Sequence, residues 1–140
     1  MAYGEGADPR NATLKAATTV SGAGYLLTND STNNTLDLTA VSEICIGVSA
    51  GESSRDADQA YESTGATVAY YPLGGVLMVA ATASQTWTTG VTVYIASSGL
   101  ATTASGSSAK KLGLYVGEGQ TTGSADGDLI AVNTQGAAIA

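Results

Sequence analysis

Every apolar run in this chain is short and ends at residues that form turns. The most apolar stretch, residues 73–83, has about 11 residues and contains two glycines, and glycine makes up 18 of the 140 residues. Runs of about four to eight aliphatic or β-branched residues, bounded by such turn formers, are typical of strands, whereas helices need longer periodic segments. The chain is therefore predicted to be all-β, folded as a single small antiparallel barrel or sandwich.

The predicted strands differ in how clearly the sequence marks them. Residues 91–95 alternate most regularly, because Val91, Val93 and Ile95 share one face of a strand. Residues 44–48 form a continuous apolar run, as expected of a strand that is covered on both faces. The full set of predicted strands is residues 25–28, 36–39, 44–48, 66–71, 76–80, 91–95, 100–102, 112–116 and 129–132.

The N-terminal region differs from the rest of the chain. Gly4, Gly6 and Pro9 interrupt it, and few large apolar side chains anchor it. A helix could begin at Asn11, but the Thr-Thr-Val sequence that follows at residues 18–20 forms helices poorly. We expect residues 1–20 to form an extended N-terminal arm and residues 21–140 to form the β-rich body.

The charge of the chain restricts its partners. Twelve acidic against five basic residues give a net charge of −7. Nucleic-acid binding depends largely on Lys and Arg, so DNA and RNA are not expected partners. The apolar stretches fall short of the roughly 20 residues that cross a membrane, and the N-terminus lacks a signal-peptide pattern. We expect a soluble protein that binds no membrane and is not exported by a standard route.

The residue types needed for most catalytic sites are scarce. The chain has no histidine, the usual general base and metal ligand, and its single cysteine, Cys45, excludes an internal disulfide and a Cys-based zinc site. Cys45 stands between two isoleucines, which predicts a buried and unreactive thiol. We expect no enzymatic activity, no metal and no cofactor. A small enzyme with two carboxylates that meet only in space is kept as a third hypothesis.

Three local patterns resemble ligand sites but have a simpler interpretation. The acid pairs Asp56/Asp58 and Asp126/Asp128 could each approach a calcium ion, but neither has the spacing of a calcium loop, and solvated turns are favoured. Ser107 and Ser108 lie close to Lys110, as a Ser-Lys dyad would require, but the sequence around them lacks the sharp turn that presents a nucleophilic serine. The glycines of residues 117–123 do not have phosphate-loop spacing.

Aromatic and aliphatic residues are the best candidates for a protein-binding surface. Trp87 stands in a polar connection, and the adjacent Tyr70 and Tyr71 should point to opposite faces of a strand. The alternative for Trp87 is that it folds back as a lid on the core. The aliphatic run 76–79 could be covered when copies of the chain assemble. The predicted capsid or subunit contacts are Tyr3, Arg10, Tyr70, Tyr71, Leu77, Val79 and Trp87.

The order of the glycine-aliphatic segments over residues 40–134 resembles the small capsid decoration (cement) proteins of tailed bacteriophages. In that family an apolar-Gly-Val strand leads to a G-V-x-V-Y hairpin, then to an apolar-Gly strand, and finally to a G-D-x-apolar strand. The corresponding sequences here are ICIGVSAGE (44–52), GVTVYI (90–95), KLGLYVG (111–117) and DGDLIAVN (126–133), with LGGVLMVAA (73–81) and GLATT (99–103) between them.

This resemblance implies a structural function. Such a protein has a β-rich body and an N-terminal arm, commonly forms a homotrimer, and bridges neighbouring major capsid proteins on the outer surface of an expanded head, stabilising it against the pressure of packaged DNA. It would be made in the host cytoplasm and become part of the virion. No catalytic residues belong to the pattern. The alternative hypothesis is a carbohydrate-binding or adhesin-like β-sandwich module of a virion fibre, with Trp87 and the tyrosines on its sugar face.

Overall fold

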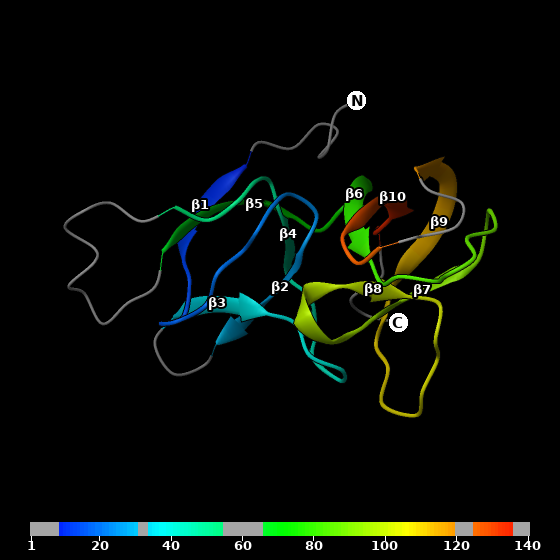
Figure 1. The fold of residues 1–140 in the computed structure, drawn as a ribbon, viewed down its shortest axis with the longest axis horizontal. Helices are drawn as coiled ribbons and strands as arrows, with labels where there is room; N and C mark the ends of the chain where they lie inside the picture. The colour runs from blue at the N-terminus through cyan, green and yellow to red at the C-terminus, as the bar shows by residue number, and fades with distance from the viewer. Residues whose placement is uncertain (1–8, 31–33, 55–65, 120–124, 136–140) are drawn as a thin grey trace.

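The computed structural model describes residues 9–30, 34–54, 66–119 and 125–135. It confirms the all-β fold class: the strands form one closed barrel and one open five-stranded sheet, which lie side by side (Figure 1). A short 3-10 turn, η2 (Ser97–Gly99), lies between two strands of the barrel. In chain order the strands are β1 (Arg10–Thr13), β2 (Leu26–Asp30), β3 (Thr35–Leu38), β4 (Gly47–Ser49), β5 (Thr67–Pro72), β6 (Val76–Ala81), β7 (Thr92–Ile95), β8 (Ala101–Thr102), β9 (Lys111–Gly119) and β10 (Asp128–Asn133).

The barrel has the strand order β10-β6-β8-β7-β9. Its longest ladder joins β10 to β6 in an antiparallel register from Asp128 opposite Ala81 to Asn133 opposite Val76. Because alternate residues of a strand face opposite sides, one set of aliphatic side chains points inward and fills the barrel. This core includes Val79, Val93 and Ile130, all fully buried.

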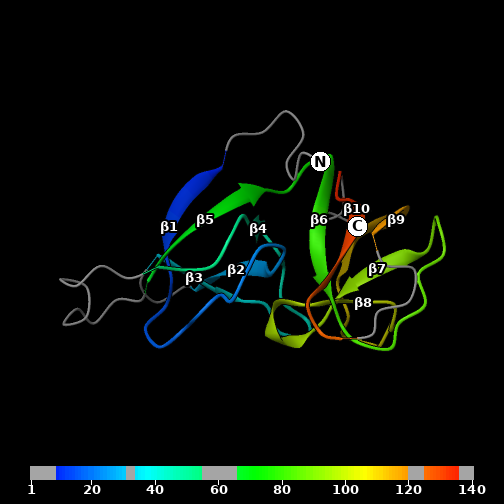
Figure 2. The same cartoon turned by 45° about the horizontal axis from the view of Figure 1, so that its top comes forward.

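The open sheet has the order β1-β5-β4-β2-β3 and its own apolar core. Leu14, which directly follows β1, forms a parallel bridge with Leu36 of β3, so the two edge strands approach each other at this point. The same core holds Leu27 and Val68, from β2 and β5. Figure 2 shows the sheet beside the barrel from a second direction.

Close backbone contacts join the two parts. The amide of Ala80 in β6 donates a hydrogen bond to the carbonyl oxygen of Gly24, over 2.7 Å. Gly24 has φ +96°, and a Cβ there would lie 2.9 Å from the Ala80 nitrogen, so this junction requires glycine. Gly99 makes a similar approach, since its Cβ would lie 2.7 Å from the Leu38 side chain. The barrel and the open sheet therefore pack as connected parts of one structure.

Residues 10–20 belong to the open sheet, which corrects the boundary expected at residue 20. Strand β1 pairs antiparallel with β5 from Arg10 opposite Tyr70 to Thr13 opposite Thr67. Leu14 and Val20 are 0% and 1% exposed and lie in the core of this sheet. The sequence did not indicate that Leu14 and Val20 belong to a core, because residues 15–19 between them are small or polar. The first eight residues of the predicted arm lie outside the described residues.

The apolar run 44–48 is also different from the prediction. Only its last two residues enter strand β4, and Ile44 is 52% exposed. Gly47 passes close under β5, where a Cβ would lie 2.6 Å from the ring of Tyr70 and 2.8 Å from the carbonyl oxygen of Tyr71. The run therefore begins at the surface and becomes buried toward Val48.

Candidate interaction surface

Leu77 and Val79 are core residues, which corrects their prediction as contact residues. Both are 0% exposed, because in β6 they point into the barrel together with Ala81. Val76 and Met78 alternate with them on the outer face and are half-buried. The consecutive large residues of this run thus reflect the strand alternation in a small barrel. The inward-facing side chains of Leu77 and Val79 are therefore inaccessible to a partner.

Trp87 is also buried, in agreement with the alternative that it covers the core. It is 3% exposed, and its ring packs on Tyr115 of β9 with ring centroids 5.7 Å apart and an interplanar angle of 44°. The flanking Thr86 and Thr88 are exposed, so the connection is polar except for this one side chain. A sugar could not stack on Trp87 in this structure. The adhesin hypothesis therefore loses its principal residue.

The remaining predicted contact residues lie on the open sheet or outside the described residues. Tyr70 and Tyr71 point to opposite sides of β5, as predicted: Tyr70 packs against the core of the open sheet and Tyr71 against that of the barrel. Both are half-buried. Arg10 is exposed in β1, at the edge of the sheet. Tyr3 lies outside the described residues.

The thiol of Cys45 and the carboxylates of residues 126 and 128 form hydrogen bonds with the backbone. Burial raises the pKa of the Cys45 thiol to about 12 from an ordinary value of 9.0, although hydrogen bonds with the backbone of Gly47 and Leu27 oppose this shift. Cys45 is therefore protonated at neutral pH and unreactive as a nucleophile. The acids at residues 126 and 128 both accept backbone hydrogen bonds. Asp128 accepts one from the amide of Ala125 within the same turn, over 3.2 Å, as expected for a solvated turn, whereas Asp126 accepts one from the distant amide of Ala83, over 2.7 Å.

Residues 9–30, 34–54, 66–119 and 125–135 contain no cluster of three or more Cys, Asp or Glu side chains that could hold a metal ion. No helix in the part of the chain that the structure describes has the length and apolar character needed to cross a bilayer. Asp56 and Asp58 lie outside these ranges.

Two exposed aliphatic side chains that the sequence analysis did not select stand together on one loop. Val41 is 46% exposed and Ile44 is 52% exposed, and both belong to the loop formed by residues 40–44, between β3 and β4. The amide of Ala40 donates a hydrogen bond to the carboxylate of Glu43, over 2.6 Å, and the amide of Glu43 donates to the carbonyl oxygen of Ala40, over 3.2 Å. The 40–44 loop is therefore a braced turn that presents two aliphatic side chains to solvent.

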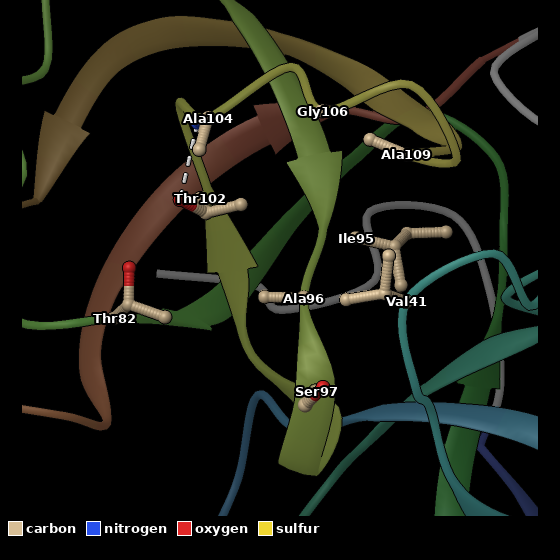
Figure 3. A pocket seen from close by; sticks show the side chains of 9 residues that line it. All are labelled: Val41, Thr82, Ile95, Ala96, Ser97, Thr102, Ala104, Gly106 and Ala109. Atoms are coloured by element: carbon tan, nitrogen blue, oxygen red, sulfur yellow. Dashed lines mark hydrogen bonds between the residues drawn. The ribbon is translucent and has the colours of Figure 1, made fainter.

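An apolar pocket lies next to this loop, on the barrel side (Figure 3). Its volume is about 410 Å³. Small side chains form most of its wall, and Gln85 fixes one side by accepting hydrogen bonds from the hydroxyls of Thr102 and Thr103, over 3.1 and 2.6 Å. The pocket is lined by Val41, Thr82, Ile95, Ala96, Ser97, Thr102, Ala104, Gly106 and Ala109.

Two consecutive lysines follow the pocket-lining loop in the chain, although neither lines the pocket itself. Lys110 follows the pocket residue Ala109, its carbonyl oxygen accepts a hydrogen bond from the amide of Ile95 over 2.9 Å, and Lys111 begins β9. Both are exposed, and neither forms an ion pair with a described residue. By contrast, Lys15 lies 3.9 Å from a carboxylate oxygen of Asp37. Two positive charges therefore follow an apolar pocket residue in the chain, in a protein whose net charge is −7.

The sequence contained a weak signal for this surface. Val41 and Ile44 are aliphatic residues that flank a serine and a glutamate, but no pattern in the sequence shows that the turn holds them outside the core. The pocket is formed by segments far apart in the chain, so the sequence could not reveal it. No protein-family model matches this chain, and no curated protein matches it.

Proposed function

We propose that this protein is a capsid decoration protein of a tailed bacteriophage. In this role it binds the outside of an expanded head, as a homotrimer, and bridges neighbouring major capsid proteins. The observation that carries the proposal is the ordered series of glycine-aliphatic segments over residues 40–134. In the structure, five of the six segments supply the strands of the closed barrel, β6, β7, β8, β9 and β10. The resemblance thus follows the residues that build the core.

The surface of the protein supports binding to other proteins. Exposed aliphatic side chains beside an apolar pocket are typical of protein–protein contacts, and Val41 and Ile44 provide them here. The net charge of −7 disfavours contact with packaged DNA, which suits a protein that stays outside the shell. The small barrel has a buried aliphatic core that also encloses Trp87, so these side chains are used for folding and the contacts with other proteins fall to the exposed residues.

Binding to capsids tests the proposal directly. Fluorescently labelled protein is mixed with expanded heads that lack a decoration protein, and with unexpanded heads of the same phage as a control. The protein should sediment with the expanded heads alone and should raise the temperature at which they release DNA. If it sediments with neither form across a range of concentrations, the proposal is wrong. A major capsid gene beside the gene for this protein would identify the phage to use.

A further inference from the structure

We propose that the 40–44 loop, the pocket and the two lysines together form the surface through which copies of this chain bind one another. The loop of one copy enters the pocket of the next, with Ile44 in the pocket and Glu43 facing Lys110 and Lys111. This inference rests on the proposed function for the expectation that the protein assembles with itself, and it adds the surface that does so. The residues themselves come from the exposed, apolar and charged groups that the structure brings together.

The loop is rigid enough to act as an inserted group. Its two hydrogen bonds, between Ala40 and Glu43, hold the turn closed, and Ser42 adopts φ +76° within it. A braced loop loses little conformational freedom when it binds, which favours association. Val41 already lines the pocket of its own chain, whereas Ile44 does not. Ile44 is therefore the side chain that is available to a neighbouring copy.

The pocket can receive a branched aliphatic side chain. Figure 3 shows Val41 beside Ile95 at one side and Thr82 at the other, with Ala104, Gly106 and Ala109 contributed by the loop that follows β8. The wall is predominantly apolar, and its small side chains leave a volume of about 410 Å³. Such a pocket favours an apolar side chain over a polar one, because a polar group would lose its hydrogen bonds to water.

The two lysines indicate which charge a partner should carry next to its aliphatic side chain. Lys110 follows the pocket residue Ala109 in the chain, and neither Lys110 nor Lys111 forms an ion pair among the described residues. A fitting partner therefore presents a carboxylate next to an aliphatic side chain. The 40–44 loop has this arrangement, with Glu43 directly before Ile44. Both halves of the contact are present on one chain, which is the property of a surface that forms symmetric oligomers.

Sedimentation velocity over a range of protein concentrations tests this contact in the full chain. The wild-type protein should form an oligomer, and Ile44→Asp should weaken self-association at least ten-fold. A matched control is Leu114→Asp, because Leu114 is 42% exposed on β9 but is neither on the loop nor in the pocket. The control should associate as the wild type does. Circular dichroism checks that each variant is folded. A wild type that stays monomeric, or equal effects of the two variants, would overturn the inference.

Disulfide trapping identifies the two sides of the contact. In a Cys45→Ala background, one sample carries Ile44→Cys and a second carries Ala109→Cys, and the two are mixed with oxidised glutathione. Linked dimers of one copy of each variant should form in the mixture and not between two copies of either variant. Disulfide formation at the same slow rate in the mixture and in each variant alone would overturn the inference.

The outcomes for this surface and for the proposed function can be told apart. If the wild-type protein binds expanded heads but the Ile44→Cys and Ala109→Cys variants do not cross-link to each other, the decoration function is kept and this interface is removed. Efficient trapping without any binding to expanded heads has the opposite meaning: the self-association surface stands and the decoration function is wrong.

Discussion

Alkaline unfolding should be coupled to the single thiol of this protein. Cys45 is buried, and the desolvation of its charged form raises its pKa from 9.0 to about 12. Above pH 9 the unfolded chain releases the thiol proton while the native protein retains it. The unfolded state then binds fewer protons than the native state, so stability falls as the pH rises. The contribution of this group is present in full below pH 9 and is lost as the pH rises toward 12.

The size of this effect follows from the two pKa values. Each pH unit between them costs about 1.4 kcal/mol, so at pH 10.5 the thiol lowers the free energy of unfolding by about 2 kcal/mol relative to pH 8. Urea unfolding of the wild type and of Cys45→Ala at both pH values measures it. The two proteins differ only at residue 45, so the difference between their two pH-dependent losses of stability isolates Cys45. Equal losses in the two proteins would refute the reasoning.

Two further predictions concern the backbone and the N-terminal strand. Gly113→Ala should destabilise the protein by about 1–3 kcal/mol, because a Cβ would overlap the carbonyl oxygen of Asn133 across the β9–β10 ladder. Gly106→Ala is the control: its Cβ would meet nothing within 4 Å, and thermal unfolding should show no more than a small change. Deletion of residues 1–20 should abolish the cooperative unfolding transition, because it removes Leu14 and Val20 from the core of the open sheet. A truncated protein with an unchanged transition would show that the sheet is stable without them.

Most strands were predicted to within one residue of the structure at each end, namely β3, β5, β6, β7, β8 and β10. Short runs rich in apolar or β-branched residues mark them in the sequence. Strand β1 was missed, since Arg-Asn-Ala-Thr has no apolar alternation and is held by pairing with β5. In residues 44–48 the apolar composition predicted a strand, but the chain is extended in the sheet only from Gly47.

The contact residues were harder to predict than the strands, for a physical reason. A barrel of five short strands has a small interior, and the large side chains of Trp87, Tyr115 and Leu77 fill it before any partner binds. Large aromatic residues in such a protein are therefore poor markers of its binding surface. Better markers are aliphatic side chains that a hydrogen-bonded turn keeps out of the core. Val41 and Ile44 meet this condition, because the bonds between Ala40 and Glu43 fix the turn that exposes them.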